Sequence, residues 1–136
     1  MAAVTISAGN QLPLNADTKL GHKAANAAIG HGIVIYEDTA TGKVGIADHT
    51  AEATAVAIGI TYTKSLADGH EIHYVREGEM YLGSAVLTQG VTYYLGTAGA
   101  IVPDSDVGTG DFVTILGIAK DGNTLDVDIK VGTAKP

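Results

Sequence analysis

The feature of this sequence that most limits its fold is a succession of short segments in which apolar residues recur at every second position. In the clearest segment, residues 125–131, the alternate residues are apolar and the residues between them are charged. This is the pattern of a half-buried β-strand. Residues 112–119 are apolar on both faces, which predicts a central strand covered on both sides. Similar strands are predicted at 33–36, 56–62, 72–76, 80–82 and 91–95.

Turn signals separate these segments: Thr41-Gly42, Asp68-Gly69, Glu77-Gly78, Gln89-Gly90, Ala98-Gly99 and Asp121-Gly122. Aromatic residues make up only 5% of the chain, while glycine is abundant at 18 residues. Short strands at this spacing are typical of a sandwich or a barrel. The sequence therefore predicts an all-β fold, a β-sandwich or barrel-like domain of short strands.

An internal repeat emerges when the chain is aligned with itself at an offset of 58 positions. Residues 32–60 and 90–118 then share eight identities without a gap, where this composition would give about three by chance. The matched pairs are Gly32/Gly90, Tyr36/Tyr94, Thr39/Thr97, Ala40/Ala98, Val44/Val102, Asp48/Asp106, Gly59/Gly117 and Ile60/Ile118. We interpret residues 32–75 and 90–129 as two related β units; the alternative is that recurrent turn chemistry imitates a repeat.

The first thirty residues differ from the rest of the chain. Their only apolar alternation is Val4, Ile6 and Ala8, and the remainder is polar, with Pro13 and an alanine-rich stretch that is a weak candidate for a short helix. We interpret residues 1–30 as an N-terminal arm or an edge strand, and residues 31–136 as the β domain. An arm of this kind can bury its apolar side chains on a neighbouring molecule.

The chain is acidic, with a formal net charge of −7 and a sequence pI near 4.9. An acidic surface repels phosphate backbones and anionic lipids, so neither nucleic acid nor a membrane is an expected partner. The start, MAAVTISAGNQ, lacks the regions of a secretory signal, and no apolar run is long enough to cross a bilayer. Cysteine is absent, which excludes disulfides and thiolate metal sites.

Residues with catalytic or metal-binding chemistry form no convincing pattern. His70 and His73 lie on opposite faces of a predicted strand and cannot chelate one ion. Asp48 and His49 near Glu52 suggest a cluster, but the repeat keeps the aspartate and replaces the histidine, so we interpret Asp48 as a turn residue. We expect no enzyme activity, no cofactor and no metal site.

One acidic loop needs separate mention. Residues 104–111 resemble a fragment of a calcium loop because Asp104, Asp106 and Asp111 are closely spaced. The segment lacks the glycine and the distal glutamate of an EF-hand loop. We interpret it as a loop capped by aspartates.

Four segments together resemble small head-decoration or cement proteins of tailed phages. They are GIVIYEDTATGKVGIAD, AVAIGIT, VREGEMYLGSAV and YYLGTAGAIVPDSDVGTGDFVTILGIA, followed by the final alternating strand. The resemblance covers roughly residues 30–131, and its most distinctive part is the middle segment, which ends in YYLGTAGAIVP. Residues 1–30 match nothing in that family.

The resemblance implies a bacteriophage virion structural protein, a capsid decoration or cement protein. Such proteins bind the outside of an expanded capsid through the major capsid protein, stabilise it, and are often homotrimers. The resemblance transfers no catalytic residue. It implies synthesis in the host cytoplasm and residence on the capsid surface. Within this reading, the arm would carry partner binding through Val4, Ile6, Leu12 and Leu14.

Two alternatives remain open. One is a phage tail or fibre component or a cell-surface β module, since such proteins use the same short strands and glycine-containing turns. The chain could also be a small oligomeric β-barrel hydrolase whose active site is shared between subunits. Binding to empty heads, to tails or to cells would distinguish the capsid hypothesis from the tail, fibre and cell-surface hypotheses. A deep polar pocket that contains acidic residues with shifted pKa values would favour the enzyme.

Overall fold

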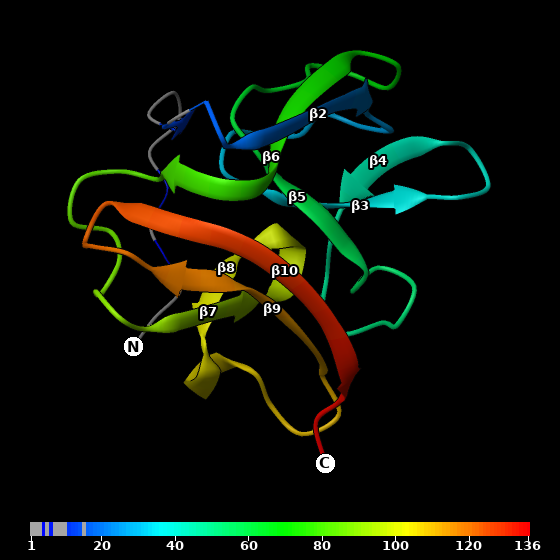
Figure 1. The fold of residues 1–136 in the computed structure, drawn as a ribbon. Coiled ribbons are helices and arrows are strands. Elements are labelled where there is room, and N and C mark those ends of the chain that lie inside the picture. Colours follow the sequence, from blue (N-terminus) through cyan, green and yellow to red (C-terminus); the bar gives the residue numbers. More distant parts are fainter. Residues whose placement is uncertain (1–3, 5, 7–10, 15) are drawn as a thin grey trace.

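The computed structural model describes residues 4, 6, 11–14 and 16–136. Its regular structure is nearly all β, and the strands form one curled antiparallel sheet that resembles half a barrel (Figure 1). The prediction of an all-β, barrel-like domain of short strands is therefore confirmed.

Ten strands and two short 3₁₀ turns make up the described elements. In chain order they are β1 (Leu12–Pro13), β2 (Lys19–Ala24), β3 (Val34–Asp38), β4 (Lys43–Ile46), β5 (Ala57–Thr61), β6 (Glu71–Tyr81), β7 (Thr92–Leu95), η1 (Thr97–Gly99), β8 (Ile101–Pro103), η2 (Asp104–Asp106), β9 (Phe112–Ala119) and β10 (Thr124–Ala134).

The sheet follows the order β4-β3-β5-β6-β10-β9-β7-β8, and β1 and β2 each pair with β6. The two longest strands, β6 and β10, lie at the centre and join the two halves of this path. One predicted turn falls inside β6: Gly78 has φ +106 and a Cβ there would stand 2.8 Å from Cα of Thr18. The Glu77-Gly78 pair therefore bends a continuous strand where a turn was predicted.

The two halves of the sheet have the same internal arrangement. In strands β3–β6, which we call the first unit, β3 pairs with both β4 and β5, and β5 pairs with β6. In strands β7–β10, the second unit, β7 pairs with both β8 and β9, and β9 pairs with β10.

The strand register repeats as well. In the first unit the partners are Val34↔Ile60, Ile35↔Gly59 and, after an irregularity, Tyr36↔Ala57. Adding 58 to each number gives the pairs of the second unit with the same irregularity: Thr92↔Ile118, Tyr93↔Gly117 and Tyr94↔Ile115. Tyr36 and Tyr94 thus occupy the same strand context, as an internal duplication predicts.

The repeat continues into the central strands with a different spacing. Ile60 pairs with Val75 and its counterpart Ile118 pairs with Asp126, so the loop between β9 and β10 is the shorter one. By this alignment β6 corresponds to β10 with an offset of 51 positions (126 minus 75). Glu77 then corresponds to Asp128, and these two residues are also direct partners across the central seam.

The N-terminal residues from 19 onward pack with the β domain, which agrees with the edge-strand interpretation of this segment and not with a separate arm that ends at residue 30. β2 pairs with β6 from Lys19↔Glu77 to Ala24↔Glu71. Ala25 then forms a parallel bridge with Val44 of β4, and Ala25 and Ile29 are both buried. These contacts close the path β4-β3-β5-β6-β2 on itself. This pairing could not be predicted from the sequence, because β2 has little apolar alternation and the buried residues, Ala25 and Ile29, come after it.

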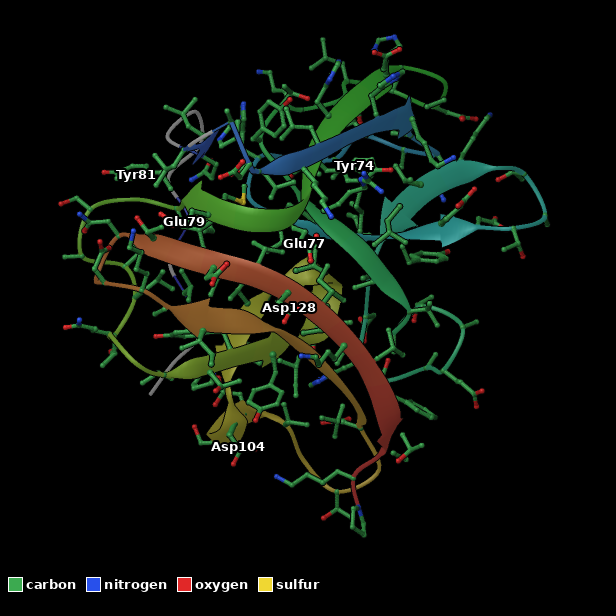
Figure 2. The ribbon with its side chains drawn as sticks, viewed as in Figure 1. Tyr74, Glu77, Glu79, Tyr81, Asp104 and Asp128 are labelled. Atoms are coloured by element: carbon green, nitrogen blue, oxygen red, sulfur yellow. The ribbon has the colours of Figure 1, made fainter. Side chains whose placement is uncertain are left out.

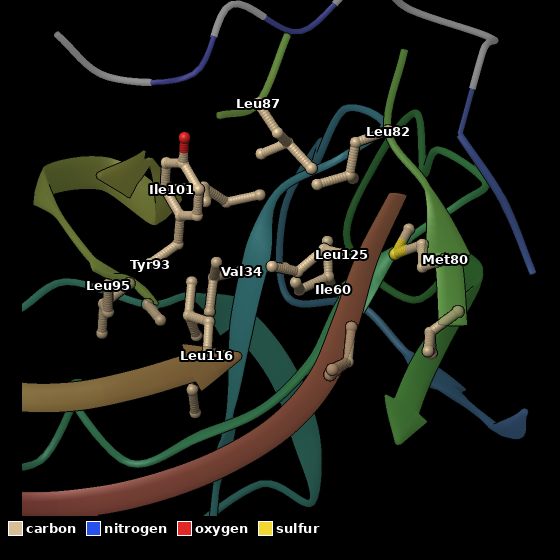
Figure 3. Close-up of a cluster of buried hydrophobic side chains, with 14 of the residues drawn as sticks. Val34, Ile60, Met80, Leu82, Leu87, Tyr93, Leu95, Ile101, Leu116 and Leu125 are labelled. Atoms are coloured by element: carbon tan, nitrogen blue, oxygen red, sulfur yellow. The ribbon is translucent and has the colours of Figure 1, made fainter. Parts of the chain in front are cut away.

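The main core lies between the two units (Figure 3). It contains side chains from both, among them Val34, Ile60, Met80, Leu82, Leu87, Tyr93, Leu95, Ile101, Leu116 and Leu125. A smaller cluster lies between the first unit and the segment that follows β2, and it contains Ala25, Ile29, Ile35, Val44, Ile72 and Tyr74. Because the units share the larger cluster, they form one domain.

Candidate functional site

The four predicted partner-binding residues of the N-terminal segment divide into two pairs. Val4 and Ile6 are partly buried and pack against the main core of their own chain. The backbone N–H of Val4 also donates to the carbonyl of Ile101 in β8 at 2.8 Å. Their own chain therefore covers part of these two side chains, which the partner-binding prediction assigned to a neighbouring molecule.

Leu12 and Leu14, in contrast, are exposed by 55% and 45%. Leu12 lies opposite Tyr81 at the end of β6, and the N–H of Leu14 donates to the carbonyl of Glu79 at 3.1 Å. The preceding Gln11 is buried, and its amide Nε2 donates to the carbonyl of Leu82 at 3.1 Å. The two leucines are thus presented by a backbone that is fixed to the sheet.

The solvent-facing side of strands β6, β10, β9 and β7 lies beside these leucines. On β10, Leu125 and Val127 are buried, so Asp126 and Asp128 point to solvent. We call the following set the outer sheet face: Leu12, Leu14, Glu77, Glu79, Tyr81, Thr92, Ile115, Ile118, Asp126, Asp128 and Lys130. Figure 2 shows Tyr81, Glu79 and Glu77 following β6, with Asp128 beside Glu77.

Strand pairing places parts of this face in a row across four strands. The row contains Thr92, Ile118, Asp126 and Glu79, each the direct partner of the next. Ile118 is 52% exposed, so the row presents an apolar side chain to solvent. The row combines an apolar side chain with two carboxylates, a mixture that suits contact with another protein surface.

The central seam is acidic. Glu77 lies opposite Asp128 and Glu79 lies opposite Asp126, and like charges in such positions destabilise a strand pair. Lysines offset this repulsion: Lys19 lies 2.9 Å from Glu77, Lys120 lies 2.8 Å from Glu79, and Lys130 lies 3.1 Å from Asp128. The hydrogen bond and charge of Glu79 raise the pKa of Lys120. These pairs are exposed, so each contributes little to stability.

Two shallow grooves border the strands of the second unit. One, of about 240 Å³, is lined by Thr92, Ile115, Gly117, Ile118, Asp126, Asp128 and Lys130. The other, of about 220 Å³, is lined by Glu52, Ala55, Val56, Phe112, Val131, Gly132 and Thr133. Both are smaller than the pockets that usually bind small molecules, roughly 300–1,000 Å³. The first groove lies within the outer sheet face, since all of its lining residues except Gly117 belong to that set.

The side chains of Asp48 and His49 hold loops of the domain in place through hydrogen bonds. Asp48 Oδ1 accepts hydrogen bonds from the N–H and hydroxyl of Thr50, and Oδ2 accepts one from the N–H of Ala98 at 3.0 Å. His49 is buried, with Nε2 3.3 Å from the hydroxyl of Thr97 and 3.5 Å from Asp111 Oδ2. Thr97, Ala98 and Asp111 belong to the loops of the second unit, so these contacts hold the two units against each other.

The carboxylates of the acidic loop at residues 104–111 do not meet at one point. Asp104 and Asp106 lie in the exposed turn η2, while Asp111 Oδ2 accepts the N–H of Gly108 at 2.8 Å. Across the part of the chain that the structure describes, no three His, Asp or Glu side chains are already placed to hold a metal ion. The same part of the chain contains no helix of the length and apolarity needed to span a membrane.

Sequence reasoning missed two groups of residues. The first is the outer sheet face as a whole, which depends on which strands become neighbours. Of its residues, Leu12 and Leu14 were predicted to bind a partner, and the alternation at 125–131 predicted a charged face with Asp126, Asp128 and Lys130. The second group is His22, Glu71 and His73, which the pairing of β2 with β6 brings together.

Comparison with known proteins adds no assignment, since no protein-family model, no curated protein and no solved structure matches this chain.

Proposed function

We propose that this protein is a virion structural protein that binds the outside of a tailed-phage capsid and stabilises it. The observation that carries the proposal is the outer sheet face, where exposed Leu12, Leu14 and Ile118 lie beside in-register carboxylates on rigid strands. A surface of this kind gains binding energy from buried area and needs no reaction chemistry. The partner is the major capsid protein.

The sequence resemblance supports the same function. Its distinctive middle segment includes residues 93–103, which form β7 and β8, and its closing segment GDFVTILGIA forms β9, which carries Ile115 and Ile118 of the outer sheet face. The other matching segments form β3, β4, β5 and most of β6. The resemblance also supports a homotrimer on the capsid, since such proteins often act as trimers.

The physical properties of the chain suit this role. A cement protein works as many copies on one shell, so modest affinity per copy is multiplied across the assembly. A net charge of −7 keeps unassembled copies soluble and away from DNA. The capsid site that fits the outer sheet face would place basic and apolar side chains opposite Asp126, Glu79 and Ile118.

Co-sedimentation with expanded, DNA-free heads tests the proposal. The purified wild-type chain should sediment with heads, and a Leu14→Ser, Ile118→Ser double variant should remain largely in the supernatant. Leu66→Ser is the matched control, because Leu66 is 69% exposed on the loop between β5 and β6, outside the outer sheet face. Circular dichroism should show the same fold for all three proteins.

Each outcome of this experiment is informative. If the wild-type chain does not sediment with heads, the capsid function is wrong, and binding to tails or host cells would favour the fibre or cell-surface reading. If the double variant binds as well as the wild type, attachment lies elsewhere on the domain. If Leu66→Ser loses binding to the same extent, the outer sheet face is not the specific contact.

A further inference from the structure

Two histidines from distant parts of the sequence meet on one face of the first unit. His22 of β2 is the direct partner of His73 of β6. Their rings are stacked, with centroids 5.6 Å apart and planes inclined by 30°. Directly opposed positions on paired antiparallel strands have Cβ atoms roughly 5 Å apart, close enough for both side chains to reach one ligand.

A carboxylate completes this group. Glu71 lies two residues before His73 on β6, so the two side chains share a face of the strand. Oε1 of Glu71 is 3.0 Å from Nε2 of His73 and 3.6 Å from Nδ1 of His22. One oxygen thus lies near a nitrogen of each ring.

We propose that His22, His73 and Glu71 bind a divalent transition-metal ion such as Zn²⁺. Two imidazole nitrogens and one carboxylate oxygen are a common ligand set for such ions. With metal–ligand bonds of about 2.0–2.2 Å, two ligands of a tetrahedral ion lie roughly 3.4 Å apart. The two nitrogen–oxygen distances in the structure, 3.0 and 3.6 Å, lie on either side of that value.

Binding requires the side chains to rotate, because among the described residues no three His, Asp or Glu side chains stand where they could hold a metal ion together. The group has the freedom to rotate: the side chains of His22, Glu71 and His73 are exposed by 67%, 58% and 42%. On binding, Glu71 exchanges its contacts with the rings for a bond to the ion, and water occupies the remaining position. Tyr62, whose ring centroid lies 6.2 Å from that of His73, flanks the site.

The ion would link β2 to β6. β2 is the strand that closes the first unit, just before Ala25 meets Val44. An ion that binds the folded chain and not the unfolded one stabilises the fold in proportion to its occupancy. The proposal does not depend on the capsid function, because the group lies outside the outer sheet face.

The test uses the full chain, without a polyhistidine tag and stripped of metal. Titration calorimetry with ZnCl₂ should show one saturable site, and the melting temperature should rise with Zn²⁺. His22→Ala and His73→Ala should each weaken binding by roughly tenfold or more, and Glu71→Gln should weaken it less. His31→Ala, in the turn before β3, is the control and should bind Zn²⁺ as the wild type does.

A spectroscopic measurement keeps the result independent of stability. In ¹H–¹⁵N spectra of the imidazole rings, Zn²⁺ should shift the signals of His22 and His73 and leave those of His31 and His70 unchanged. The proposal is overturned if the wild type shows no saturable binding. It is also overturned if His22→Ala and His73→Ala bind Zn²⁺ as tightly as the wild type, or if His31→Ala abolishes binding.

Discussion

Tyr74 and Gly59 lie so close on the neighbouring strands β6 and β5 that a Cβ on residue 59 would stand 2.5 Å from Cδ2 of the Tyr74 ring. On β2, a Cβ on Gly21 would stand 2.6 Å from Cζ of the same ring. The buried ring of Tyr74 therefore lies across both neighbouring strands. This packing of an aromatic ring over glycines fixes the pairing of three strands.

The first prediction concerns the two glycines at equivalent positions of the units. Gly59→Ala should destabilise the fold by about 1–3 kcal/mol, because the methyl group overlaps the Tyr74 ring and the carbonyl of Val75. Gly117→Ala should cost at least as much, because its methyl group would meet the carbonyl of Asp126, the counterpart of Val75. Urea unfolding measures both values. Gly30→Ala is the control, since a Cβ there meets only Ile33 at 4.0 Å.

The second prediction is that the N-terminal segment is needed for stability. Removing residues 1–24 deletes β1 and β2 and also removes Val4 and Ile6, which pack against the main core, and the buried Gln11. The melting temperature should fall by more than about 10 °C. A Leu12→Ser, Leu14→Ser variant, altered only at exposed side chains, should melt close to the wild type. An unchanged melting temperature after truncation would restore the interpretation of this segment as a separate arm.

The third prediction concerns a buried hydroxyl that holds the connection between β2 and β3. The hydroxyl of Thr61 donates to the carbonyl of Gly30 at 2.7 Å and accepts the N–H of Ile33 at 3.0 Å. Thr61→Val keeps the shape and leaves both backbone groups without this partner, which should cost about 2 kcal/mol. Chemical denaturation measures it. The exposed Thr133→Val should change stability by less than about 0.5 kcal/mol, and an equal loss there would contradict the argument.

The fourth prediction is a pH dependence at Asp48. Partial burial acts to raise its pKa, but hydrogen bonds from Thr50 and Ala98 outweigh this effect, so the pKa lies below its usual 3.8. A carboxyl whose pKa is lowered by folding stabilises the fold above the usual value and loses that contribution as the pH falls through the lowered value. Asp48→Asn should therefore destabilise the protein at neutral pH, by no more than about 1 kcal/mol because solvent screens the group.

Melting curves between neutral pH and about pH 2 test this difference, since the two proteins should converge at the acid end. Asp106→Asn, at the exposed counterpart position of the second unit, is the control and should follow the wild type throughout. A gap between wild type and Asp48→Asn that stays constant down to the acid end would show that the charge of Asp48 is not the cause.

Local patterns were enough to predict the strands whose alternation is strong. The predicted segments 33–36, 56–62, 91–95 and 112–119 correspond to β3, β5, β7 and β9. β2 could not be found in this way, because its stability comes from partners on β6 rather than from its own apolar residues. Its glycine at position 21 looks like a helix or strand breaker until the ring of Tyr74 is seen to need that space.

The candidate sites depended even more on topology. Leu12 and Leu14 were predicted as binding residues and are exposed, whereas Val4 and Ile6 are covered by surface that only the folded chain creates. The outer sheet face and the His22–His73 pair combine residues about 50 positions apart, and no spacing rule within one segment connects them. Strand register is the missing information, and the repeat at 58 positions was its only trace in the sequence.

The pairing of Glu77 with Asp128 has a further consequence. Equivalent residues that are also each other's partners lie at an approximate two-fold axis, where any residue must face its own counterpart. This explains why acid meets acid at the seam, since a side chain of one sign is brought opposite its equivalent. The units associate as the two subunits of a symmetric dimer do, but residues 82–91 connect them. The chain therefore pays no bimolecular association cost, and its assembly at the seam is independent of protein concentration.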